Sequence, residues 1–162
     1  MPGQTKRKST KEPEVDVRSI PRVRVVVEAT LFDNEEIILD RPAAIEDLPV
    51  IRDEMLTSDR ERFICIHLDA KNRVLSWELV SVGSLMAAIV HPRELFKAAI
   101  LANAASVVLC HNHPSGDATP SGADIQLTRR LAKAGDVIGI EVLDHLVITG
   151  KACISFRDLG LL

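Results

Sequence analysis

Alternation of helix-like and strand-like segments in the second half of the chain constrains the fold more than any other feature. Residues 92–104, "PRELFKAAILANA", have apolar side chains at helical spacing and precede the short apolar strand 106–110, "SVVLC". Residues 124–135, "DIQLTRRLAKAG", predict a second helix that stops at Gly135, and residues 138–156 predict two more strands. This order predicts an α/β domain in which helices are layered against a mixed β-sheet.

The first half of the chain adds further strands and one helix to this pattern. Residues 62–83 predict two strands joined by a turn, and alternating valines in 22–32 predict another strand. Residues 45–56 predict a helix that begins near Asp47, with Pro49 in its first turn.

The chain length fits one main domain with a short N-terminal addition. Its 162 residues suffice for one sizeable core and leave little room for a second. We predict a disordered basic tail over 1–20, an N-terminal extension with a strand over 21–44, and the main domain over 45–162.

Charge and composition limit the function classes. Residues 1–24 carry seven Lys or Arg against three acidic residues, a net charge of +4, and the whole chain carries −3, so the remainder carries −7. Residues 25–162 are therefore not expected to bind nucleic acid, which leaves the basic tail as the one possible contact. No secretory signal or membrane-length apolar segment is seen, and three scattered cysteines form no CxxC pair. These features predict a reduced, cytoplasmic protein.

Polar residues of a kind that bind metal follow the apolar strand 106–110, in "HNHPSGDATPSGAD". His111 and His113 lie two apart, so in an extended segment both imidazoles point to the same side. The turn-forming residues that follow can return the chain, so that Ser121 and Asp124 begin the next helix. Two imidazoles and one carboxylate, with a fourth position for water, are a plausible ligand set for a catalytic zinc.

Each of these residues also has a structural interpretation. Ser121 with Asp124 fits a capping box, a role that is compatible with a catalytic one. Asp117 lies in the same loop and is better explained as a turn former than as a ligand. The contiguous letters "HNH" are no evidence for the nuclease of that name, whose residues are scattered through a different metal unit.

The spacing His111-x-His113-x7-Ser121-x2-Asp124 matches the H-x-H-x7-S-x2-D signature of the JAMM (JAB1/MPN+) metalloproteases. The wider text from "HPRELFKAAI" to "LDHLVI" resembles the bacterial RadC-like branch of that family, and the similarity runs over about residues 45–162. The resemblance implies a three-layer fold similar to that of cytidine deaminase. It also implies one Zn²⁺ per chain, held by His111, His113 and Asp124.

The resemblance further implies a metallopeptidase that hydrolyses an amide or isopeptide bond. Such enzymes use an upstream glutamate as general base, and Glu61, just before an apolar strand, has that character. Glu94 is the rival base, although an acid at a helix start is explained by the helix dipole. Ser121 would help to stabilise the oxyanion. Asp144 and His145 resemble supporting or structural residues and are not expected to be ligands.

Two other function classes stay open at this point. One is a DNA-associated accessory protein of repair or mobile elements with a structural or vestigial zinc site, against which the net charge of −7 over residues 25–162 weighs. The other is a zinc nucleobase deaminase, which is disfavoured because the H-x-E and P-C-x-x-C patterns are absent. The substrate, a protein or peptide, and the oligomeric state are not indicated by the sequence.

Overall fold

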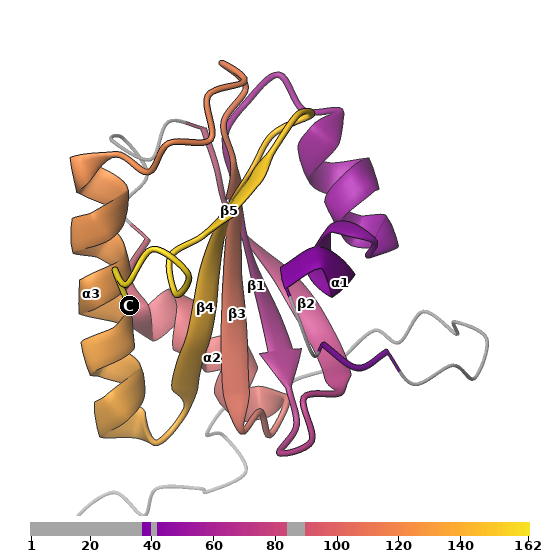
Figure 1. Ribbon diagram of the computed structural model, residues 1–162. Coiled ribbons are helices and arrows are strands. Elements are labelled where there is room, and N and C mark those ends of the chain that lie inside the picture. Colours follow the sequence, from indigo (N-terminus) through magenta and orange to yellow (C-terminus); the bar gives the residue numbers. More distant parts are fainter. Residues whose placement is uncertain (1–36, 40–41, 84–89) are drawn as a thin grey trace, which may run out of the picture.

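Five strands form one mixed sheet at the centre of the molecule (Figure 1). The structure is a computed structural model that describes residues 37–39, 42–83 and 90–162. Along the sheet the strand order is β2-β1-β3-β4-β5, with β3 and β4 parallel and the other neighbours antiparallel. The strands are β1 (Arg62–Leu68), β2 (Val74–Val82), β3 (Ser106–Asn112), β4 (Glu141–Ile148) and β5 (Cys153–Ser155).

Helices cover both faces of this sheet and give three layers (Figure 1). The short helix α1 (Pro42–Glu46) and the π-helical segment η2 (Ile51–Leu56) lie on one face. The longer helices α2 (Pro92–Leu101) and α3 (Gly122–Ile138) lie on the other. The predicted α/β architecture, with helices layered against a mixed sheet, is confirmed.

Strand periodicity explains how one sheet supports two separate cores. In β1 alternate side chains point to opposite faces, so Ile64 and Ile66 pack toward α1 and η2, while Phe63 and Cys65 pack toward α2 and α3. The central strand β3 divides in the same way, and all seven of its residues are buried. A strand buried on both faces explains why 106–110 reads as an uninterrupted apolar segment.

The crossover from β3 through α3 to β4 determines where polar side chains gather. Parallel neighbours require a long connection, which α3 supplies while packing over the sheet. The carboxyl end of β3 therefore lies beside the loop that leads to the first turn of α3. Ligand sites in α/β sheets commonly lie at this end of the strands.

One local prediction was wrong. Gly135 does not end α3, which continues to Ile138 and is capped by Gly139 with φ +81°. Gly135 instead allows a close approach, because a Cβ there would lie 2.4 Å from the carbonyl oxygen of Ile140. The helix predicted near Asp47 is present, because Pro49 and Val50 are helical and continue into η2; the short helix α1 before it was not predicted.

The basic tail 1–20 and the strand predicted in 22–32 lie outside the described residues. Within the described ranges, no helix is both long and apolar enough to span a bilayer.

Candidate metal centre

Three side chains from two elements converge at the carboxyl end of β3. His111 is the penultimate residue of β3, His113 follows the strand, and Asp124 lies in the first turn of α3. Their ligand atoms all lie within 4.8 Å of one another. The Nε2 atoms of His111 and His113 are 3.0 Å apart, and each lies 3.6 Å from a different carboxylate oxygen of Asp124. The structure thus brings together the three ligands predicted from the sequence.

The loop between the two histidines and α3 fixes the orientation of His113. The Nδ1 atom of His113 lies 2.6 Å from the carbonyl oxygen of Asp117. A carbonyl only accepts, so this nitrogen carries the proton, and in the neutral ring the lone pair lies on Nε2, on the side of Asp124. Asp117 acts through its backbone, while its carboxylate accepts from the amide of Thr119 at 2.9 Å in a local turn. The interpretation of Asp117 as a turn former agrees with this geometry.

Ser121 and Asp124 form a reciprocal cap at the start of α3. The Ser121 hydroxyl accepts from the Asp124 amide at 3.2 Å, and the Asp124 carboxylate accepts from the Ser121 amide at 2.7 Å. The predicted capping box is therefore present. The second bond also aims the carboxylate of Asp124 at the two imidazoles.

Asp124 is a buried carboxylate that is nevertheless held in its ionised form. Its side chain is 2% exposed. Burial raises its pKa, but the interactions with His111 and Ser121 outweigh burial and leave the pKa below the usual range of an aspartate. A buried anion facing two imidazole nitrogens is an arrangement that a divalent cation would satisfy. The donor set therefore fits zinc, which imidazole and carboxylate ligands commonly bind.

A second pair of residues supports His111 from behind. The Nδ1 atom of His111 lies 2.8 Å from Nε2 of His145 in β4, and Nδ1 of His145 lies 2.6 Å from the hydroxyl of Thr128 in α3. His145 is fully buried between the rings of Phe63 and Phe156, at centroid distances of 5.3 and 4.6 Å. Burial, together with the neighbouring His111, lowers the pKa of His145 well below its usual value.

Asp144, the neighbour of His145, has a different role. Its carboxylate accepts from the Ser155 hydroxyl at 2.6 Å and from the Arg157 amide at 3.0 Å. These bonds attach the C-terminal turn to β4. Asp144 and His145 were predicted as supporting or structural residues, and the geometry divides them: His145 supports the ligands, and Asp144 supports the fold.

Glu61 lies immediately before β1, at the same end of the sheet as the ligands. Phe63 pairs with His111 in the antiparallel β1–β3 register, and Glu61 lies two residues before Phe63. Asn112 fixes the strand ends, since its side chain accepts from the Arg62 amide at 2.7 Å and donates to the Arg60 carbonyl at 3.1 Å. Sequence reasoning missed this contribution of Asn112.

Glu94, the rival base, faces solvent near the start of α2. Its carboxylate pairs with Lys97 at 3.0 Å and with Arg93 at 3.2 Å, and these hydrogen bonds lower its pKa. An exposed carboxylate held by two cations is a surface ion-pair network, which agrees with the structural interpretation of this residue.

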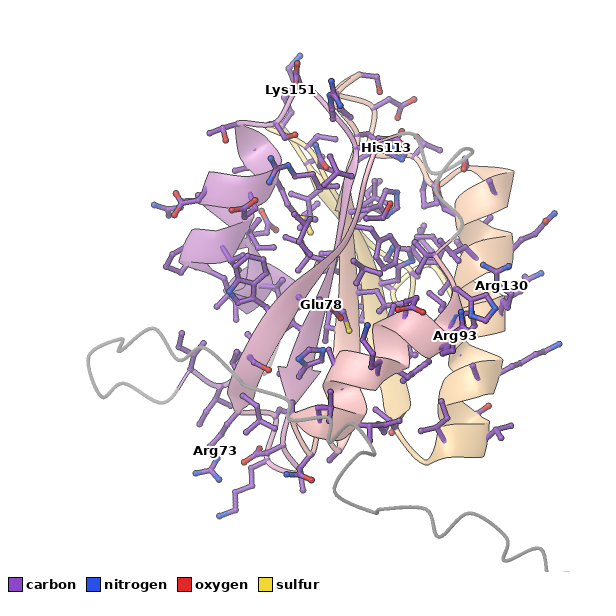
Figure 2. The ribbon with its side chains drawn as sticks, turned by 180° about the vertical axis from the view of Figure 1, so that it is seen from behind. Arg73, Glu78, Arg93, His113, Arg130 and Lys151 are labelled. Carbon is purple, nitrogen blue, oxygen red and sulfur yellow. The ribbon has the colours of Figure 1, made fainter. Side chains whose placement is uncertain are left out.

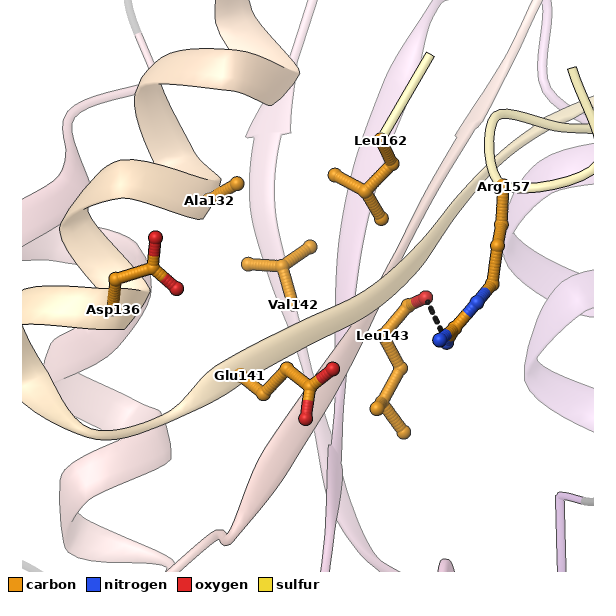
Figure 3. A pocket seen from close by; sticks show the side chains of 7 residues that line it. All are labelled: Ala132, Asp136, Glu141, Val142, Leu143, Arg157 and Leu162. Atoms are coloured by element: carbon orange, nitrogen blue, oxygen red, sulfur yellow. Dashed lines mark hydrogen bonds between the residues drawn. The ribbon is translucent and has the colours of Figure 1, made fainter. Parts of the chain in front are cut away.

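Of the pockets on the described surface, one lies away from the candidate ligands and one adjoins them. The larger, of about 290 Å³, is formed by α3, β4 and the C-terminal turn, where Arg157 donates to the Leu143 carbonyl (Figure 3). No metal ligand lines it. The smaller, of about 90 Å³, adjoins the ligand cluster because His113 forms part of its wall, together with Met55, Ile148 and Gly150. His113 lies at the end of the molecule opposite Arg73 in Figure 2.

Comparison with known proteins agrees with the resemblance found in the sequence. A family model described as the RadC-like JAB domain matches residues 40–161. The UPF0758 protein of Desulforamulus reducens is 50% identical over 113 residues, which make up 70% of this chain and 50% of that protein. UPF0758 protein YsxA of Bacillus subtilis is 44% identical over 132 residues, or 82% of this chain and 56% of that protein. The chain thus spans about half the length of these curated relatives. It belongs to the RadC-like JAB domain family.

Proposed function

We propose that the chain is a zinc-dependent metallopeptidase that hydrolyses an amide or isopeptide bond in a protein or peptide. The observation that carries the proposal is the convergence of His111, His113 and Asp124, whose ligand atoms lie within 4.8 Å of one another. Membership of the RadC-like JAB domain family supports the same activity. A cytoplasmic setting belongs to the proposal and is supported by the free state of Cys65, Cys110 and Cys153.

His111, His113 and Asp124 would hold the ion and leave one tetrahedral position open. When bound, zinc would supply a Lewis acid that polarises the scissile carbonyl and lowers the pKa of a water molecule. Glu61 would accept the proton of the attacking water and deliver it to the departing amine, so that its carboxylate is regenerated in each turnover. Its position two residues before Phe63, which pairs with His111, supports this role.

Ser121 would donate a hydrogen bond to the developing oxyanion. Its oxygen accepts from the amide of Asp124, and a hydroxyl that accepts a bond still has its own proton to donate. Ser121 is exposed at the surface while Asp124, three residues later, is buried. A substrate could therefore reach the hydroxyl, which the capping box holds beside the ligands.

The proposal is tested with a peptide library from a digested bacterial proteome, in which new termini are identified by mass spectrometry. Zinc-loaded parent protein and the Glu61→Gln, Glu94→Gln and Ser121→Ala variants are compared. Parent and Glu94→Gln should give the same cleavages. Glu61→Gln should retain its zinc and lose about 10²- to 10⁴-fold in rate, the usual contribution of general acid–base catalysis. Absence of new termini with zinc-loaded parent, or equal cleavage by Glu61→Gln, would contradict the proposal.

A further inference from the structure

We propose that Thr128 and His145 are positioning residues that fix the tautomer of His111, so that its Nε2 lone pair faces the metal. They do so through a directed chain of hydrogen bonds that begins at His111 in β3, passes through β4 and ends in α3. This inference rests on the metal site proposed above and assigns roles to two residues outside the ligand set.

Thr128, at the α3 end of this series of hydrogen bonds, determines which group donates in each bond. Thr128 has a single hydroxyl proton, and this proton is donated to the backbone carbonyl of Asp124 at 2.7 Å. The oxygen of Thr128 is therefore an acceptor in its second bond, to Nδ1 of His145 at 2.6 Å. It follows that Nδ1 of His145 carries a proton.

The next step follows from the surroundings of His145. Its ring is fully buried, stacked on Phe156 and tilted against Phe63, and its two nitrogens contact Thr128 and His111. A charged imidazolium without a carboxylate partner is unfavourable in such a place, so the neutral ring has a bare Nε2. That nitrogen accepts from Nδ1 of His111 at 2.8 Å. His111 then carries its proton on Nδ1 and presents the Nε2 lone pair to the site.

His113 reaches the same state by another route, because its Nδ1–H group donates to the Asp117 carbonyl. In their neutral forms both imidazoles therefore offer bare Nε2 atoms, 3.0 Å apart, each 3.6 Å from an oxygen of the Asp124 carboxylate. The series of hydrogen bonds also ends on the backbone of Asp124, which is itself a proposed ligand. It thus connects ligands from β3 and α3 into one unit, and a supporting partner of this kind is commonly worth 10- to 100-fold in metal affinity.

The first arm of the test needs no metal. The full-length chain is labelled with ¹⁵N in its histidines and stripped of metal. Long-range ¹H–¹⁵N correlation NMR then identifies the protonated nitrogen of each imidazole ring. We expect His145 and His111 to be protonated at Nδ1. Protonation of His145 at Nε2 would overturn the inference even if zinc binds normally.

The second arm measures zinc affinity by competition with a chromophoric chelator. Thr128→Val keeps the shape of the side chain and should weaken zinc binding about 10- to 100-fold, while Thr128→Ser should restore it. Ser76→Ala is the matched control, because the Ser76 hydroxyl contacts Nδ1 of another buried histidine, His67, at 2.8 Å. Ser76→Ala should leave zinc affinity unchanged.

The two arms separate this inference from the proposed function. Zinc binding by Thr128→Val that equals that of the parent would overturn the inference and leave the metallopeptidase proposal standing. Failure of the parent chain to bind zinc would overturn the proposed function. The tautomer of His145 in the metal-free parent also decides the inference if Thr128→Val does not fold.

Discussion

Replacement of Gly135 by alanine tests how α3 is held against the sheet. The added Cβ would lie 2.4 Å from the carbonyl oxygen of Ile140, 3.2 Å from Cζ of Phe96 and 3.5 Å from Cγ2 of Val142. The first contact is with backbone that cannot rotate away. The same turn also contains two bonds to the Gly135 carbonyl, from the amides of Gly139 at 2.8 Å and Ile140 at 3.0 Å.

Two opposing terms set the expected size of the effect. Alanine in place of glycine favours a helix interior by about 1 kcal/mol. Overpacking a closed contact costs about 1 to 3 kcal/mol, and we expect the upper end because the nearest atom belongs to the backbone. The difference predicts that Gly135→Ala lowers the free energy of unfolding by about 2 kcal/mol.

Urea unfolding followed by far-UV circular dichroism measures this change, which should appear as a lower midpoint at an unchanged slope. Gly122→Ala is the matched control, since Gly122 lies in the same helix and a Cβ there meets nothing within 4 Å. That variant should differ from the parent by less than about 0.5 kcal/mol. A Gly135→Ala chain as stable as the parent would refute the close-approach argument.

Three further predictions concern titration, metal and thiols. Burial lowers the pKa of His67 to about 4 from an ordinary 6.5, so the unfolded chain binds a proton at a higher pH than the folded chain does. Between pH 7 and 5 this difference should lower the free energy of unfolding by about 2 kcal/mol. Urea titrations should show a smaller loss for His67→Asn. Zinc at about 1,000 times its Kd should stabilise the folded parent by about 4 kcal/mol and raise its Tm, and EDTA should reverse this rise. At the same zinc concentration the Tm of Asp124→Asn should rise much less. Burial raises the pKa of the Cys65 and Cys110 thiols, so both should react slowly with a disulfide reagent at pH 8 until urea unfolds the chain; rapid reaction of the native protein would contradict the buried placement.

The sequence predicts those parts of the site that depend on local geometry. Strand periodicity places His111 and His113 on one side, and the capping pattern of Ser121 with Asp124 predicts the helix start that returns the carboxylate. Both relations extend over only a few residues. For this reason the three candidate ligands could be named before their positions in space were known.

Features that depend on pairing between distant segments could not be predicted in this way. The hydrogen bond between His145 and Thr128 depends on how α3 lies over β4. The hydrogen bond from the Arg62 amide to the Asn112 side chain depends on the register of β1 with β3. A weak signal for Thr128 did exist, since it lies one helical turn after Asp124 and faces the same side. Gly135 was misread because a glycine late in a helix pattern indicates either a stop or a close approach, and only tertiary packing decides between them.

The zinc content of the purified chain tests the central claim most directly. Elemental analysis should give about one zinc per chain for the parent, as three protein ligands with an open position require. His113→Ala should lose most of this zinc, because it removes an Nε2 atom 3.6 Å from the Asp124 carboxylate. His91→Ala, which changes an exposed histidine at the start of α2, should keep it. A parent chain without zinc, or a His113→Ala chain with as much zinc as the parent, would contradict the account.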